Sequence, residues 1–231
     1  MITGGNKGIG LALTKKFQAN GFEVIVIGRN FDHFTVPEVK TITFDLNEVE
    51  KIPALAKEIG KIDILINNAG IDRQRPYYDY PQEEVNRILN VNLKAPIALI
   101  NAFLPDFLER KEGKIVNVAS QAAEVGHTDI WYGITKAGLV NVTKSFAAIV
   151  GKDGVLVNAV APGPVETEMI HNTNIPERFE QVKSRTYLNR VAEPEEVAEV
   201  IYWLATDVPV YVNGETIDIN NGAQRVKNYS R

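Results

Sequence analysis

Short apolar runs that alternate with longer helical patterns are the feature that most constrains the fold of this chain. The runs are rich in β-branched residues, as expected for parallel strands that are covered on both faces. We expect strands at Glu23–Gly28, Val39–Phe44, Ile62–Ile66, Lys114–Val118, Val155–Val160 and Thr216–Ile219. Helical patterns cover Gly8–Asn20, Val49–Ile59, Pro81–Glu109, Trp131–Val150 and Pro194–Thr206. This alternation predicts right-handed crossovers and a doubly wound, mostly parallel sheet with helices on both faces, which is an α/β fold.

The length of 231 residues suits one α/β domain or two small ones. We find no internal repeat and no linker, so residues 1–231 are expected to form a single domain. The first strand is unusual, because only Met1 and Ile2 precede the glycine-rich segment that begins at Thr3. Either this strand is very short, or the sequence begins downstream of the natural start.

The composition excludes several kinds of binding site and binding partner. The chain has no cysteine, which excludes disulfides, thiolate catalysis and cysteine–zinc sites. Its three histidines lie far apart in the sequence, and we expect no metal site. A net charge of −4 without a basic block argues against a nucleic-acid or anionic-membrane surface. No secretory leader and no apolar run of membrane-spanning length are found, so we expect a cytoplasmic protein without a membrane partner.

The glycine-rich segment between Thr3 and Gly10 opens a helical pattern. Glycines at a strand-to-helix turn let the backbone approach a pyrophosphate, and the helix N-terminus presents free N–H groups to its charge. The segment is not the phosphate loop of nucleotide hydrolases, because Leu11 follows Gly10 where that loop has lysine. The motif therefore indicates either a dinucleotide site or a plain glycine turn.

The end of the next strand carries Gly28 and Arg29. Sites that hold the ribose 2′-hydroxyl of NAD place an acidic residue there, whereas a guanidinium suits the 2′-phosphate of NADP. Lys7, inside the glycine-rich segment, adds a second positive charge. These positions favour NADP(H) over NAD(H); the alternative is that both are solvated surface cations.

Two amides follow the strand Ile62–Ile66, in the sequence Asn67-Asn68-Ala69-Gly70. They stand at the carboxyl end of a strand, where open α/β sheets bind ligands. The amides can tie neighbouring strands together, while Ala69 and Gly70 leave space for a flat ligand. A simple strand-end turn is the alternative, and the two roles are compatible.

Tyr132 and Lys136 lie four residues apart on a helical pattern, so their side chains share one face. Free tyrosine has a pKa of about 10, and a nearby ammonium lowers it toward the working range of a base. Ser120 ends the preceding strand pattern, where its hydroxyl can face the same crevice. Tyrosine and lysine at this spacing also occur by chance in many helices; the strand-end serine favours a catalytic site.

Taken in order and spacing, these motifs resemble the classical short-chain dehydrogenase/reductase family essentially from end to end. Further matching positions are Asp45-Leu46, Asn92, Asn158 and Pro162–Val165 with Thr167. The resemblance implies a single Rossmann-type domain and hydride transfer between a nicotinamide cofactor and a carbonyl or secondary alcohol. Its substrate classes include 3-oxoacyl thioesters, sugars, steroids and small ketones.

The resemblance also implies roles by position. Tyr132 is the general acid/base, and Lys136 lowers its pKa and holds the nicotinamide ribose. Ser120 hydrogen-bonds the substrate oxygen, Asn92 steadies a water in the proton relay, and Asp45 contacts the adenine. The cofactor-binding residues so implied are Thr3, Gly4, Asn6, Lys7, Gly8, Ile9, Gly10, Arg29, Asp45, Leu46, Asn68, Ala69, Gly70, Tyr132, Lys136, Pro162, Gly163, Val165 and Thr167.

The sequence departs from the family pattern at the short first strand, at Leu156 where many relatives carry Arg, and at Asn221-Gly222. The segment Glu168–Arg190, which closes over substrate in the family, has no pattern that we can assign. Substrate identity is therefore open. Side chains expected to line the pocket are Gln121, His127, Trp131 and Met169, with ordinary packing as the alternative for Trp131 and Met169.

Two other functions are compatible with this fold: a dinucleotide-sensing regulator with weak or no catalysis, and an epimerase or dehydratase. The presence of the tyrosine, lysine, serine and asparagine disfavours the first, and the lack of length for an added substrate domain disfavours the second. The helices at Pro81–Glu109 and Trp131–Val150 are apolar on more than one face. Since relatives pair these two helices across a two-fold axis, we expect a homodimer or homotetramer.

Overall fold

The computed structural model describes residues 1–73, 75–76, 78–171 and 178–223. Its seven strands form one parallel sheet in the order β3-β2-β1-β4-β5-β6-β7. The strands are β1 (Ile2–Thr3), β2 (Val24–Gly28), β3 (Val39–Thr43), β4 (Ile64–Asn67), β5 (Gly113–Val118), β6 (Val155–Pro162) and β7 (Thr216–Ile219). This order is that of a Rossmann-type doubly wound sheet, whose direction of winding reverses between β1 and β4. The predicted fold class is confirmed.

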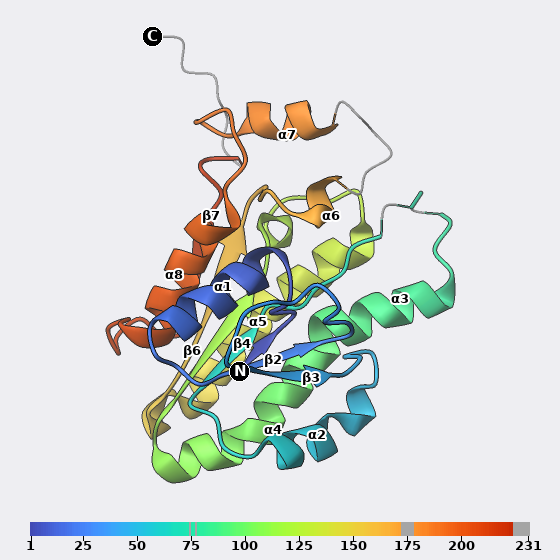
Figure 1. Ribbon diagram of the computed structural model, residues 1–231. Coiled ribbons are helices and arrows are strands. Elements are labelled where there is room, and N and C mark those ends of the chain that lie inside the picture. The colour runs from blue at the N-terminus through green and yellow to red at the C-terminus, as the bar shows by residue number, and fades with distance from the viewer. Residues whose placement is uncertain (74, 77, 172–177, 224–231) are drawn as a thin grey trace.

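Helices cover both faces of the sheet. The principal ones are α1 (Gly8–Ala19), α2 (Ile52–Ile59), α3 (Gln82–Leu89), α4 (Ala95–Arg110), α5 (Ile130–Val150) and α8 (Pro194–Thr206). Figure 1 shows α1 and α8 together on one side of the sheet, and α2 and α4 on the other. Each predicted strand is present with ends shifted by at most two residues, and each predicted helix is present, although the one predicted at Val49–Ile59 begins with a 3-10 turn at Val49–Lys51.

Two apolar cores lie on opposite sides of the sheet. Strand residues alternate between them: Ile27 contributes to the core under α2 and α4, and Val26 to the core under α1 and α8. Leu156, one of the departures from the family pattern noted in the sequence, is 8% exposed and packs in the second core. A sheet buried on both faces explains why its strands have nearly continuous apolar sequences.

The first strand is short in the structure. Ile2 pairs with Val26 of β2 and with Ile66 of β4, and Thr3 pairs with Ile27. Its side chains are nevertheless almost fully buried, with Ile2 2% exposed. Pairing on both edges lets two residues occupy the centre of the sheet and aim the glycine-rich segment at its carboxyl edge.

The predicted continuous helix Pro81–Glu109 is wrong in one detail. A π-helical turn at Asn90–Lys94 separates α3 from α4. Such turns are rare, and they occur frequently at functional sites because the extra residue re-aims a side chain. Here the turn contains Asn92, which is completely buried.

The stretch Gln82–Arg110 is long and apolar enough to cross a membrane by length and composition, with a mean hydropathy of 1.3 over its 18-residue window. Within the molecule its largest apolar residues face the core. Leu99, Ile100 and Phe107 are 0% exposed. Packing against the sheet therefore accounts for part of the hydropathy of this stretch, of whose apolar window 44% is buried.

Two short helices, α6 (Glu168–His171) and α7 (Arg178–Arg185), occupy most of the segment that the sequence left unassigned. Both lie beyond the carboxyl edge of the sheet (Figure 1). Residues 172–177 of the expected substrate-covering segment lie outside the described part of the chain.

Candidate active site

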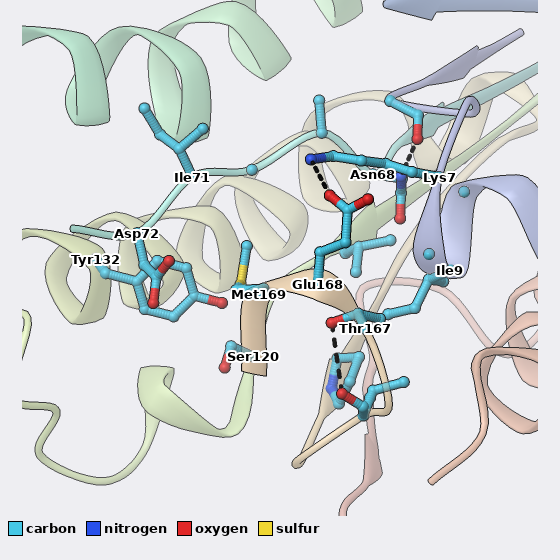
Figure 2. Close-up of a pocket in the computed structure, with 18 of the residues that line it drawn as sticks. Lys7, Ile9, Asn68, Ile71, Asp72, Ser120, Tyr132, Thr167, Glu168 and Met169 are labelled. Carbon is cyan, nitrogen blue, oxygen red and sulfur yellow. Dashed lines mark hydrogen bonds and ion pairs between the residues drawn. The ribbon is translucent and has the colours of Figure 1, made fainter. Parts of the chain in front are cut away.

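A cleft of about 1060 Å³ opens at the carboxyl edge of the sheet, where open α/β sheets bind their ligands. It extends from the glycine-rich segment and the end of β2, across the ends of β4 and β5, to the first turns of α5 and to α6. Figure 2 shows the central part of this cleft, with Lys7 at one side and Tyr132 at the other.

The glycine-rich segment is packed so closely that side chains would not fit. A Cβ at Gly10 would lie 2.1 Å from the carbonyl oxygen of Gly4, and one at Gly5 would lie 2.7 Å from Oγ1 of Thr14. Gly4 has a φ of +64°, a conformation that favours glycine. Helix α1 then begins at Gly8 with neither a side-chain cap nor an acidic residue in its first turn. Its N–H groups therefore remain available to an anion, which fits the pyrophosphate of a dinucleotide.

The two amides after β4 fix this segment in place. Asn68 donates from Nδ2 to the carbonyl oxygen of Thr3 at 2.9 Å, and the N–H groups of Asn68 and Ala69 donate to Oγ1 of Thr3 at 3.0 Å. Asn67 donates from Nδ2 to Oδ1 of Asn117 on β5 at 2.9 Å. The predicted tie between neighbouring strands is thus confirmed, and it sets the edge of the cleft across β1, β4 and β5.

Positive charge lies where β2 ends. Arg29 is exposed and lines the cleft, and Asn6 donates to the carbonyl oxygen of Asn30 at 2.7 Å, which joins the glycine-rich segment to this strand end. Asp45 lies nearby and accepts from Arg87 at 2.8 Å. Although partial burial opposes ionisation, the N–H of Asn47 and the charges of Arg87 and Arg29 hold the pKa of Asp45 below its usual value. Asp45 is therefore an ionised acceptor.

Helix α5 carries the predicted catalytic pair. Asp129 caps its N-terminus by accepting from the N–H of Tyr132 at 2.9 Å. Lys136 lies one turn further on, with Nζ 5.6 Å from the centre of the Tyr132 ring and donating to the carbonyl oxygen of Val118 at 2.7 Å. The capped helix and the strand end thereby fix the phenol and the ammonium relative to each other.

Ser120 follows the end of β5 and lines the cleft together with Tyr132. Its Oγ accepts from the N–H of Ala122 at 3.2 Å, which holds the hydroxyl in position. Figure 2 shows Ser120 and Tyr132 facing the same part of the cleft. A carbonyl oxygen placed between these two hydroxyls can receive a hydrogen bond from one and a proton from the other.

Burial dominates the electrostatics of the pair. It raises the pKa of Tyr132 to about 12, against the lowering effect of the Ser120 hydrogen bond, and the charges of Asp72 and Asp129 raise it further. Burial also lowers the pKa of Lys136 to about 8. In this state the phenol holds its proton at neutral pH, so the lowered tyrosine pKa that we expected from the sequence is not found. The reason is that desolvation of the phenolate is the largest cause of the shift, and the charges of Asp72 and Asp129 act in the same direction.

Asn92 lies behind the cleft and does not line it. Its Oδ1 accepts from the N–H of Ile71 at 2.8 Å, and its Nδ2 donates to the carbonyl oxygen of Ile71 at 2.8 Å and to Oγ1 of Thr135 at 3.2 Å. It therefore connects the segment after β4 to α5. Its expected role in holding a water stays a prediction.

The segment after β6 closes the cleft from the other side. Thr167 lies against the glycine-rich segment, since a Cβ at Gly8 would be 3.1 Å from its Cγ2. Lys7 and Glu168 form an ion pair of 3.1 Å across the cleft (Figure 2). Both side chains are more than half exposed, so the pair contributes little stability, about 0–1 kcal/mol.

The cleft brings together almost all of the residues predicted from the sequence. Of the catalytic and cofactor-binding residues, all but Thr3 and Asn92 line it, and those two support its wall from behind. Among the four side chains expected to contact substrate, Trp131 is not part of the lining, because it precedes Tyr132 by one residue and so points to another face of α5.

Sequence reasoning missed two carboxylates, Asp72 and Asp129. Asp129 is 1% exposed and caps α5. Its position before an apolar helical pattern was a recognisable cap signal. Asp72 lines the cleft in a segment without periodicity, and nothing in its sequence neighbourhood indicates that it faces Tyr132.

Comparison with known proteins places the chain among oxidoreductases. Residues 4–224 match the family model described as enoyl-(acyl carrier protein) reductase. The chain is 35% identical to the 3-oxoacyl-[acyl-carrier-protein] reductase of Thermotoga maritima, over 96% of each chain. Among solved structures it resembles 4-hydroxyisoleucine dehydrogenase complexed with NADH, with a TM-score of 0.91, 29% identity and coverage of 96% of this chain and 97% of the other. It also resembles a gluconate 5-dehydrogenase from Burkholderia cenocepacia in complex with NADP and tartrate, with a TM-score of 0.88, 27% identity and coverage of 96% and 93%.

Proposed function

The chain belongs to the classical short-chain dehydrogenase/reductase family, which makes it a carbonyl/alcohol oxidoreductase, and we propose that it works with NADP(H) through Ser120, Tyr132 and Lys136. The observation that carries the proposal is that Ser120 and the Tyr132 phenol face the same part of the cleft, with Lys136 held beside the ring and the glycine-rich segment lining the same cleft. The residues present fit a dinucleotide, because the close packing at Gly4 and Gly10 leaves the N-terminus of α1 open.

Proton transfer is assigned to Tyr132. With a pKa raised to about 12 the phenol is protonated at neutral pH, which suits donation to the oxygen of a carbonyl as it is reduced. Ser120 orients that oxygen toward the phenol. A nicotinamide cofactor would supply or take up the hydride, and Lys136 would hold its ribose and balance the phenolate that remains on Tyr132.

The preference for NADP(H) rests on charge at the end of β2. Arg29 is exposed there, and no acidic residue stands at this strand end to hold a ribose 2′-hydroxyl. A guanidinium is well shaped for the two-point recognition of phosphate. Lys7, on the facing glycine-rich segment, adds a second cation once it leaves Glu168. The structural relatives include complexes with NADP and with NADH, so the choice is made by these residues and not by the fold.

A panel of ketones, 3-oxoacyl thioesters, keto sugars and steroids, followed by NADPH absorbance, tests the proposal. We expect turnover of at least one carbonyl with NADPH and a lower kcat/KM with NADH. In Arg29→Asp this preference should reverse or disappear, since a carboxylate repels the 2′-phosphate and accepts from a 2′-hydroxyl.

The matched control is Lys40→Asp, which makes the same charge change at an exposed position on β3 outside the cleft. It should leave the cofactor preference unchanged. Equal efficiency with both cofactors in the unaltered protein contradicts the NADP assignment. Tight cofactor binding without any turnover on the whole panel would instead support a dinucleotide-sensing regulator.

We also propose a cytoplasmic homo-oligomer. On α5, Ile134 is 50% exposed and Ile149 is 64% exposed, which leaves aliphatic surface on the helix that relatives use for pairing. Light scattering should give two or four times the chain mass of 25.6 kDa. Ile134→Asp should shift the protein toward smaller species, because a charge buried in an apolar interface is costly. A monomer at micromolar concentration contradicts this expectation.

A further inference from the structure

Asp72 places a carboxylate in the substrate half of the cleft. It is half-buried and lines the cleft on the segment that follows β4. Figure 2 shows its carboxylate beside the Tyr132 ring, and its charge is one of the causes that raise the pKa of Tyr132. Neither the glycine-rich segment nor the expected cofactor residues include this position. With Tyr132 it lines the part of the cleft that lies away from Lys7.

The backbone on each side of Asp72 is fixed by a buried side chain. Before it, Ile71 is held at both its N–H and its carbonyl oxygen by Asn92, at 2.8 Å each. After it, the N–H of Arg73 donates to Oδ2 of Asp129 at 2.7 Å. Asn92 and Asp129 are 0% and 1% exposed.

The same two side chains also hold the catalytic helix. Asn92 bonds Thr135 at 3.2 Å, and Asp129 caps α5 at the N–H of Tyr132 at 2.9 Å. Asn92 and Asp129 thus each connect the backbone beside Asp72 to the helix that carries the phenol. Binding groups held by packed, hydrogen-bonded neighbours are those that select substrates with accuracy.

From this geometry we propose that Asp72 determines specificity by accepting a hydrogen bond from a hydroxyl or ammonium group of the substrate close to the reacting carbonyl. The inference rests on the proposed carbonyl reduction. An ionised carboxylate has acceptors only, so the group that faces it must be a donor. A carboxylate or phosphate of the substrate at this point would be repelled, and an alkyl group could donate no hydrogen bond to the carboxylate.

An alternative role for Asp72 is purely electrostatic. The charges of Asp72 and Asp129 both raise the pKa of Tyr132, and Ser120 lowers it. Lys136 and the ring of His127 also face the phenol. A change in the acidity of Tyr132 would alter the reduction of every carbonyl alike. Recognition of a donor group would alter only those substrates that carry one.

Three small carbonyls distinguish these roles: hydroxyacetone, aminoacetone and the donor-free 2-butanone. We expect the unaltered enzyme to have a higher kcat/KM for one of the first two than for 2-butanone. In Asp72→Leu this advantage should fall by about 10- to 100-fold, the usual worth of a hydrogen bond to a charged group. In Asp72→Asn, any advantage in kcat/KM of hydroxyacetone over 2-butanone should be retained in part, since the amide oxygen still accepts a hydrogen bond. Any advantage of aminoacetone over 2-butanone should be lost.

Asp79→Asn is the matched control, because Asp79 lies on the same segment, is exposed and does not line the cleft. NADPH affinity measured by fluorescence reports folding of each variant. Equal efficiency of the unaltered enzyme on all three carbonyls overturns the assignment of Asp72 and leaves carbonyl reduction standing. A uniform fall for all three carbonyls in Asp72→Leu also overturns it. No turnover of these or any other carbonyl by the unaltered enzyme overturns both proposals.

Discussion

Replacing Tyr132 by phenylalanine is expected to lower turnover by at least about 10²- to 10⁴-fold, the range that general acid–base catalysis contributes. The substitution removes the hydroxyl and keeps the ring, so packing against His127 at 5.1 Å between ring centroids is retained. NADPH binding should survive, because the glycine-rich segment and Arg29 are untouched. Steady-state kinetics on a verified substrate and a fluorescence titration of NADPH measure the two effects separately.

The control for this change is Tyr202→Phe on α8. Tyr202 packs against Phe17, with ring centroids 4.9 Å apart, and does not line the cleft. Its loss of a hydroxyl should leave turnover almost unchanged. Near-normal turnover of Tyr132→Phe would show that another group supplies the proton, and the assignment of the chemistry would then be wrong although the fold stands.

The sequence predicted the sheet well because its strands are buried on both faces. A short, nearly continuous apolar run such as Val155–Val160 is typical of a strand that is buried on both faces, and β6 lies where it was expected. The π-helical turn at Asn90–Lys94 was not predictable in the same way. One extra residue per turn hardly changes the periodicity of a helix that continues on both sides.

Some residues of the candidate site could likewise be predicted from the sequence and others could not. The glycines and the tyrosine–lysine pair have a recognisable spacing in the sequence, and the structure brings these residues to one cleft. Asp72 belongs to no such motif, because its position in the fold depends on two buried side chains from distant segments, Asn92 and Asp129. The pKa of Tyr132 was also beyond sequence reasoning, since the spacing to Lys136 shows that a cation is near but not how much water has been removed.

Replacing Lys136 by methionine should abolish most activity without destabilising the protein at neutral pH. The ammonium is 3% exposed, and burial lowers its pKa from 10.5 to about 8. This shift corresponds to a cost of at most about 3 kcal/mol for carrying the charge in the folded state, at about 1.4 kcal/mol per pKa unit. Methionine removes that cost but also the hydrogen bond to Val118, whose loss costs about 1–3 kcal/mol. At pH 7 we therefore expect the variant to be as stable as the unaltered protein or more stable, by up to about 2 kcal/mol.

The pH dependence of this difference identifies its cause. Because the folded-state pKa of Lys136 lies below its usual value, the unfolded chain binds the proton more readily between pH 8 and 10.5, and the unaltered protein gains stability as the pH rises through that window. The methionine variant lacks this gain, so its relative stability should decline from pH 7 to pH 10 in denaturant titrations of both proteins. Alcohol oxidation, which needs the phenolate, should lose more in Lys136→Met than carbonyl reduction, because no cation then balances the charge on Tyr132. A variant that is less stable than the unaltered protein by the same amount at pH 7 and pH 10 would show that Lys136 acts through packing and its hydrogen bond alone, and not as a buried cation.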